Sequence, residues 1–217
     1  MNVLKSAYKI IRDTGQHFLF PRLCLGCKSL LLESHRLCSS CLELFTLIDP
    51  YTRCRRCFCE SRDRVCLKCR QKARGLRSIA GCFECCGPAA KMKSELEIGK
   101  KNELIQDFAA WLIVQFTRLS YPLPDIVTVV PSPKYPSGLK CDELLAKKVA
   151  QMLNRPFIPL LKRQGEGLFK WRELENLSDK VVLLIALSII GQKEIEQCAA
   201  ILKETEPTAI YGLGIFI

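Results

Sequence analysis

The hydrophobic pattern of the C-terminal half alternates between short apolar runs and longer segments in which apolar residues recur three or four positions apart. The apolar runs lie at residues 125–130, 181–187 and 211–217, and each predicts a buried strand. Helical spacing is found over residues 102–119, after Asp142, and around residues 195–202. Short buried strands that alternate with amphipathic helices predict an α/β fold with a parallel sheet from about residue 90 onward.

Local signals add detail to this pattern. Asp142 stands where it can cap the helix that follows it. The residues predicted for the inner face of that helix are Leu144, Leu145, Val149, Met152 and Leu153. A further strand is predicted over residues 79–86, closed by Gly87 and Pro88.

Residues 1–20 predict an amphipathic helix, with apolar positions separated by Lys5, Lys9 and Arg12. A helix packed on its own protein is favoured over one lying on a membrane surface. The segment lacks the uninterrupted apolar run of a signal peptide. The most apolar stretch elsewhere, residues 181–190, is shorter than the roughly 18 residues that span a bilayer. We therefore expect a cytoplasmic protein with no membrane span.

Four Cys-x-x-Cys pairs follow one another in the N-terminal half. Their members are Cys24, Cys27, Cys38, Cys41, Cys54, Cys57, Cys66 and Cys69. Two residues between thiols allow both sulfurs of a tight turn to face one centre, and two such turns supply the four soft ligands of a structural zinc site. A disulfide framework is the alternative, but it requires an oxidising compartment. The spacing therefore predicts two zinc ions.

The assignment of pairs to metals stays open at the level of the sequence. Sequential pairing, first with second and third with fourth, is favoured because each short segment then closes as its own ribbon. A cross-braced arrangement, with the first and third pairs on one metal, remains the alternative. Both arrangements leave few apolar residues for a core, so the metal is expected to hold this region folded. The other cysteines are read as small apolar residues; they are Cys59, Cys82, Cys85, Cys86, Cys141 and Cys198.

Positive charge is concentrated in the half that carries the cysteine pairs. Lys and Arg outnumber Asp and Glu by 20 to 9 in residues 1–101, but the numbers are 13 and 13 in residues 102–217. A basic cluster with one aromatic residue is a candidate site for single-stranded DNA. Its predicted members are Arg53, Arg55, Arg56, Phe58, Arg62, Arg64, Arg70 and Arg74. Solvated charge without a nucleic-acid partner is the alternative.

Three further stretches accompany the cysteine pairs: Val-Val-Pro-Ser-Pro at 129–133, Gly138 followed by Glu-Leu-Leu-Ala at 143–146, and the strand and turn at 181–191. Together with the order of the elements, these stretches resemble the ComF family, over nearly the whole chain. The resemblance implies zinc ribbons followed by a type I phosphoribosyltransferase-like domain. It also implies a role in DNA uptake during natural competence.

The chain departs from that family at the turn that binds phosphoribosyl pyrophosphate. Where family members carry two adjacent aspartates, this sequence has Ile185 and Ala186. Isoleucines at 189 and 190 replace the family's two threonines. Ser188 and Gly191 are all that remains as a remnant phosphate loop. Because no carboxylate is left to hold magnesium, we expect neither phosphoribosyl pyrophosphate nor magnesium as a cofactor, and no catalysis.

These observations divide the chain into an N-terminal helix (residues 1–20), a double zinc-ribbon module (21–78) and a degenerate phosphoribosyltransferase-like domain (79–217). The function that the resemblance implies is that of a non-catalytic accessory in DNA uptake, which binds single-stranded DNA or DNA-uptake proteins. An active phosphoribosyltransferase of nucleotide metabolism and a structural zinc-binding interaction protein are the alternatives.

Overall fold

The computed structural model describes residues 22–31, 35–71, 75–98, 103–133, 140–172 and 175–217. The helix predicted over residues 1–20 lies outside this part of the chain. The contacts within the chain divide it into two compact units. The first unit is Met1–Thr46 with Cys86–Met92, and the second is Leu47–Cys85 with Lys93–Ile217.

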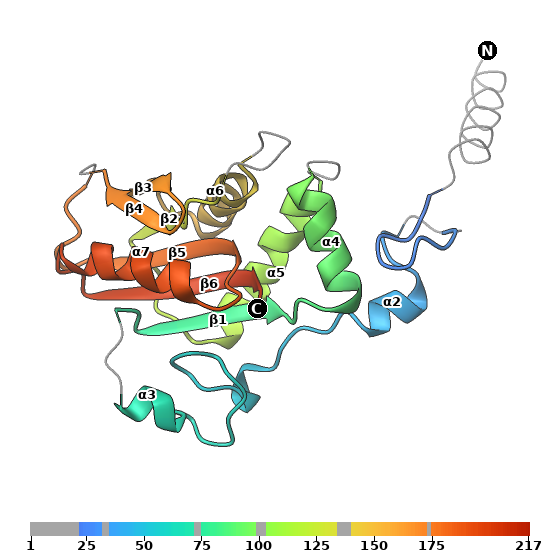
Figure 1. The fold of residues 1–217 in the computed structure, drawn as a ribbon, viewed down its shortest axis with the longest axis horizontal. Helices are drawn as coiled ribbons and strands as arrows, with labels where there is room; N and C mark the ends of the chain where they lie inside the picture. Colours follow the sequence, from blue (N-terminus) through green and yellow to red (C-terminus); the bar gives the residue numbers. More distant parts are fainter. Residues whose placement is uncertain (1–21, 32–34, 72–74, 99–102, 134–139, 173–174) are drawn as a thin grey trace, which may run out of the picture. The chain divides into compact units, whose positions relative to one another are not determined.

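The second unit is built on a four-stranded sheet in which every pairing is parallel (Figure 1). In spatial order the strands are β1 (Ser78–Phe83), β6 (Ala209–Phe216), β5 (Val181–Ser188) and β2 (Ile126–Val129). β5 is central and buried along nearly its whole length, as a continuous apolar run predicts. The predicted α/β class with a parallel sheet is confirmed.

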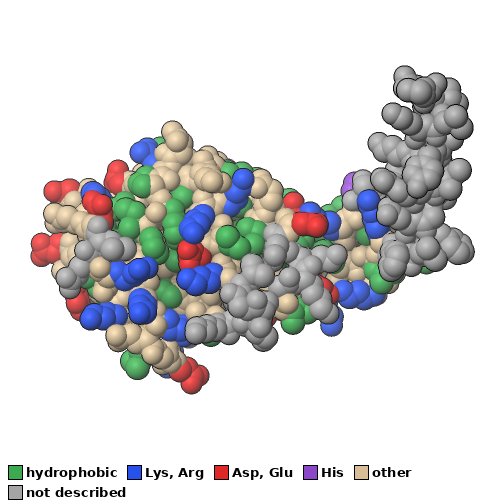
Figure 2. All heavy atoms as spheres, turned by 90° about the horizontal axis from the view of Figure 1, so that it is seen from above, with side chains coloured by type: hydrophobic (Ala, Val, Ile, Leu, Met, Phe, Trp, Pro, Cys, Tyr) green, Lys and Arg blue, Asp and Glu red, His purple; other side chains and the backbone are tan. Residues whose placement is uncertain are grey.

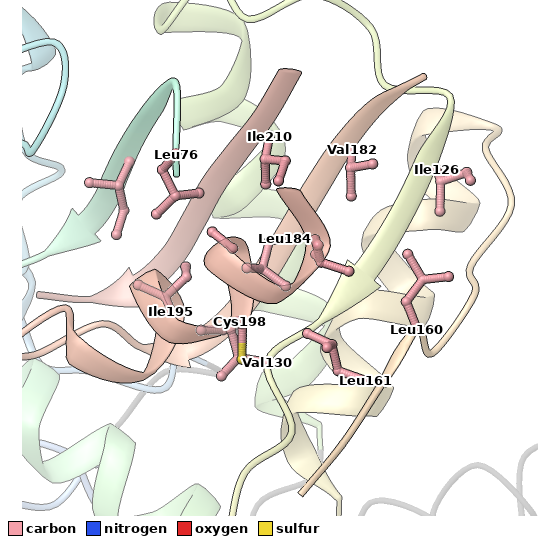
Figure 3. Packing of buried hydrophobic residues seen from close by; sticks show 14 of the residues in the cluster. Leu76, Ile126, Val130, Leu160, Leu161, Val182, Leu184, Ile195, Cys198 and Ile210 are labelled. Atoms are coloured by element: carbon pink, nitrogen blue, oxygen red, sulfur yellow. The ribbon is translucent and has the colours of Figure 1, made fainter. Parts of the chain in front are cut away.

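Helices pack against the sheet as the 3.6-residue spacing predicts. α5 (Leu104–Arg118) packs on β1 and β6, and α6 (Cys141–Leu153) packs on β2 and β5 and against α5. α7 (Lys193–Lys203) packs on β5 and β6 and against β4 (Leu168–Trp171). Leu184 of β5, together with Ile195 and Cys198 of α7, belongs to the buried cluster drawn in Figure 3.

Two expectations for α6 are wrong. The helix begins at Cys141 after Lys140, and Asp142 does not cap it. Asp142 is instead 5% exposed, and its Oδ1 accepts a hydrogen bond of 2.7 Å from the backbone N–H of Leu187 in β5. Leu144 and Met152 are exposed, whereas the buried residues of α6 include Leu145, Val149 and the small side chains of Ala146 and Ala150.

Several elements lack a counterpart among the predicted ones, and the longest of them are α4 and the β3–β4 hairpin. α4 (Gly87–Glu97) begins at Gly87, whose positive φ of 49° suits glycine, and Pro88 lies in its first turn. An antiparallel hairpin joins β3 (Leu161–Gly165) to β4 through a turn containing Gly167, whose φ is 65°. The strand predicted over residues 79–86 ends at Phe83. None of the helices formed by the described residues is long and apolar enough to cross a membrane.

Candidate metal centres

Four cysteines of the first unit form a compact cluster. The sulfurs of Cys24, Cys27, Cys38 and Cys41 all lie within 4.8 Å of one another. Cys24 and Cys27 come from a turn in which the N–H of Lys28 donates to the carbonyl of Cys24 at 2.9 Å. Cys38 precedes α2 (Ser39–Glu43), and Cys41 lies within that helix. The cluster can hold one metal ion with four thiolate ligands.

The second unit contains a matching cluster. The sulfurs of Cys54, Cys57, Cys66 and Cys69 also lie within 4.8 Å of one another. A tight turn carries the first pair, after the short 3-10 helix η1 (Pro50–Thr52), and α3 (Leu67–Gln71) carries Cys69. The structure thus groups the four pairs sequentially, first with second and third with fourth. The cross-braced alternative does not agree with this arrangement.

The two clusters are copies of one design. Equivalent residues are 30 positions apart in the turn (Cys24 and Cys54, Cys27 and Cys57) and 28 apart in the second pair (Cys38 and Cys66, Cys41 and Cys69). Lys28 and Phe58 occupy the same left-handed conformation, with φ of 63° and 60°. Antiparallel bridges flank the turns, Leu23 with Leu30 and Arg53 with Glu60. The repeat is structural, because the residues between the cysteines differ.

Backbone N–H groups are aimed at one sulfur in each cluster. The N–H of Cys38 donates to the sulfur of Cys24, and the N–H of Cys66 donates to that of Cys54, each at 3.3 Å. Burial of Cys54 opposes ionisation, but N–H donors from Cys57, Cys66 and Arg56 outweigh it and lower the pKa of its thiol to about 6. The Ser29 hydroxyl lowers the pKa of Cys27 to about 6. Thiolates are the form in which cysteine binds metal, so both clusters fit a soft, tetrahedral ion.

The second cluster is joined to the sheet. The backbone N–H of Ile79 in β1 donates to the carbonyl of Arg56 at 3.1 Å, and the Ser78 hydroxyl donates to the carbonyl of Arg55. Gln192, the residue before α7, donates from its Nε2 to the carbonyl of Cys57 at 2.6 Å. Nothing in the sequence distinguishes Gln192 as a contact residue, since its partner lies 135 positions away.

The residues predicted to bind DNA fall into two sets. One set has internal partners. Arg53 pairs with Glu84 at 2.6 Å, Arg56 donates to the carbonyl of Cys69 at 2.6 Å, and Arg70 pairs with Asp63 at 3.0 Å. Phe58 is 1% exposed, so its ring faces are covered in this structure. Arg74 lies outside the described residues.

The other set is exposed around the second cluster. It consists of Arg55, Arg62 and Arg64, and Lys68 joins it. None of these side chains forms an ion pair with another residue that the structure describes. Arg62 and Lys68 line a hollow of about 710 Å³ beside the cluster, together with Cys57, Cys59, Cys66 and Gln192. Two of the four candidate ligands, Cys57 and Cys66, thus line this hollow.

The carboxyl edge of the sheet, where ligands bind in open α/β folds, is filled by apolar side chains. Ala186 is 2% exposed and Ile189, just beyond β5, is also 2% exposed. A Cβ placed on Gly214 of β6 would lie only 2.8 Å from Cγ2 of Ile189, so the isoleucine occupies the space above that glycine. Ser188 and Gly191 flank this packed segment, with Gly191 at a φ of 73°.

A buried arginine spans the same edge. Arg163 of β3 donates from Nε to the carbonyl of Pro131, just after β2, at 2.8 Å. Its Nη2 pairs with Glu194 in the first turn of α7 at 2.8 Å, and its guanidinium lies 4.8 Å from the centre of the Phe169 ring. The segments that follow two neighbouring strands, β2 and β5, are therefore bridged by a side chain that the sequence does not single out.

Comparison with known proteins yields matches among solved structures only. No family model and no curated protein matches the sequence. Among solved structures, the chain is similar to a purine phosphoribosyltransferase from Pyrococcus horikoshii Ot3. The likeness has a TM-score of 0.31 and 11% sequence identity, and it covers 58% of this chain and 82% of that one. At that level it identifies neither substrate nor activity.

Proposed function

We propose that this chain is a ComF-like, non-catalytic accessory protein of DNA uptake, whose two cysteine clusters hold zinc and whose second cluster presents a basic surface to single-stranded DNA. The observation that carries the proposal is a cluster of four cysteines surrounded by the exposed side chains of Arg55, Arg62, Arg64 and Lys68. In this proposal residues 21–78 form the zinc modules and residues 79–217 form the scaffold.

The zinc ions would be held by the eight cysteine sulfurs and would supply structural cross-links rather than chemistry. Four thiolates close the coordination sphere, so no position is left for water or substrate. The protein contributes the turn geometry and the N–H groups that stabilise the charge on Cys24 and Cys54. Zinc on four thiolates carries a net charge of −2, which Arg56, hydrogen-bonded beside Cys69, partly offsets.

We assign phosphate recognition to the exposed basic residues, because each can reach a single strand of DNA without first breaking an ion pair or hydrogen bond of its side chain. Arg53, Arg56 and Arg70 would have to give up hydrogen bonds or ion pairs first. Lys and Arg that neutralise phosphates release counterions, which makes binding depend steeply on salt. The predicted interface is thereby reduced to Arg55, Arg62, Arg64 and Lys68.

The same assignment predicts that replacing Arg62 and Arg64 with glutamate will weaken binding of single-stranded DNA by at least about tenfold. The slope of log affinity against log salt should fall by about 1.4, since two phosphate contacts are lost at roughly 0.7 each. Fluorescence anisotropy of a labelled oligothymidine across a salt series measures both quantities.

The matched control reverses two other exposed lysines. Lys162 and Lys170 face one another on the β3–β4 hairpin, and the double change to glutamate alters the net charge equally. On the face drawn in Figure 2, Lys and Arg are interspersed with hydrophobic and acidic side chains, so attraction by overall charge is a competing explanation. Equal losses in the two variants would mean that the cysteine module is not the DNA site. No binding by the unaltered protein would leave the structural interaction protein as the remaining function.

Phosphoribosyl pyrophosphate with magnesium should leave the melting temperature of the protein unchanged. The edge of the sheet offers buried Ile185, Ala186 and Ile189 where a phosphate site needs carboxylates and small residues. A ligand at a hundred times its dissociation constant stabilises a protein by about 2.7 kcal/mol, so about 10 mM ligand reveals a dissociation constant of about 0.1 mM in thermal melts. A saturable upward shift would restore the active phosphoribosyltransferase as the leading function.

A further inference from the structure

The second cysteine cluster contains a fifth thiol that the first cluster lacks. Cys59 follows Cys57 by two positions, as Ser29 follows Cys27. The backbones agree, because the N–H of Cys54 donates to the carbonyl of Cys59 and the N–H of Cys24 to that of Ser29, both at 2.8 Å. In the first cluster the Ser29 hydroxyl lies 3.0 Å from the sulfur of Cys27. The repeat therefore places the side chain of Cys59 beside the sulfur of Cys57.

The surroundings of Cys59 agree with that placement. The sulfurs of Cys57 and Cys66 are 3.7 Å apart on this side of the cluster. Cys59 is exposed, and all three cysteines line the hollow of about 710 Å³. The hollow leaves its side chain room to turn between solvent and the cluster.

The spacing also qualifies Cys59 as a ligand. Structural zinc sites use cysteine pairs separated by about two to four residues. Two residues separate Cys54 from Cys57, which is the short end of this range. Four residues separate Cys54 from Cys59, which is the long end. Ser29 cannot act in the same way in the first cluster, because a neutral hydroxyl is a poor ligand for a soft metal ion.

We propose that Cys59 is a reserve ligand of the second metal centre, able to take the place of Cys57. In the exchange Cys59 loses its proton and donates a sulfur lone pair to the ion. Cys57 leaves and takes up a proton, so charge and coordination number are conserved. This inference rests on the proposed metal binding. It makes the second centre tolerant of the loss of the Cys57 thiolate, whereas the first centre does not tolerate the loss of the Cys27 thiolate.

The test measures metal ions per chain by native mass spectrometry on the full protein loaded with zinc. Cys57→Ser should still hold two ions, and Cys57→Ser combined with Cys59→Ser should hold one. In the first cluster Cys27→Ser should hold one ion. Adding Ser29→Cys to Cys27→Ser should restore the second metal ion. The added cysteine stands two positions after the lost ligand, as Cys59 stands two positions after Cys57.

The possible failures are distinguishable. Two ions in the unaltered protein but one in Cys57→Ser would overturn the reserve ligand and leave the metal centres standing. An unaltered protein without metal would overturn the metal centres and the reserve ligand together. Failure of Ser29→Cys to rescue Cys27→Ser, in a chain whose second centre keeps its ion, would also overturn the inference, because the two backbones are equivalent.

Discussion

Replacing Cys54 with serine should lower the metal content from two ions per chain to one and unfold the second cysteine module. Cys54 is fully buried, and its sulfur accepts the N–H of Cys66. The buried cluster of this module consists of Cys54, Cys57 and Cys69, with Val65 and Cys66 packed against it. Because the ligands are themselves the core, the free energy of metal binding, about 10–16 kcal/mol for zinc-finger peptides, is the folding free energy of the module.

Native mass spectrometry counts the ions, and limited proteolysis between η1 and β1 reports the unfolding. Cys86→Ser is the matched control, since Cys86 is exposed and outside both clusters; it should keep two ions and resist the protease as the unaltered chain does. Cys59 should not rescue Cys54→Ser, because it lines a hollow with Cys57 and Cys66 on a side of the cluster where Cys54 does not lie. A Cys54→Ser protein that keeps two ions would contradict the ligand assignment.

The cysteine clusters show what a sequence reveals when the chemistry is local. Two residues between thiols specify a turn, and four such turns in order predict two metal centres without knowledge of the rest of the fold. The sequential grouping depends on which turns come together in space, and the spacing alone leaves it open. The structural repeat was not predicted either, because Phe58 and Lys28 share a backbone conformation but no side-chain chemistry.

Failures of prediction concentrate where side-chain partners lie far apart in the sequence. Asp142 has the local signal of a helix cap, yet its carboxylate binds a strand 45 positions away. In the sequence Arg56 and Arg70 look like solvated charges. In the structure Arg56 donates to the carbonyl of Cys69, and Arg70 pairs with the carboxylate of Asp63. The β3–β4 hairpin was missed because its strands are short and each mixes apolar with charged side chains, so that neither gives a clear apolar run. Strands and helices with strong apolar periodicity were predicted close to their observed bounds.

Ala186→Asp, which places an aspartate where members of the ComF family carry one, should destabilise the second unit by about 3–5 kcal/mol rather than create a phosphate site. Ala186 is 2% exposed, pairs with Gly214 across β5 and β6, and belongs to the main apolar cluster. A carboxylate there loses its hydration, and burial raises its pKa above the ordinary value of about 4. The penalty is therefore full at high pH and shrinks as the pH falls toward that value and the group protonates.

Urea unfolding at about pH 8 and about pH 5 separates this electrostatic cost from a simple steric one, which would not depend on pH. Ile190→Asp is the matched control, four residues along the chain and 58% exposed, and its stability should change by no more than about 0.5 kcal/mol. If Ala186→Asp is as stable as Ile190→Asp, the edge of the sheet has room and polar partners for a carboxylate. Apolar packing around Ile189 would then not explain why phosphoribosyl pyrophosphate does not bind at this edge. The argument against catalysis would rest only on the absent aspartate and threonine side chains.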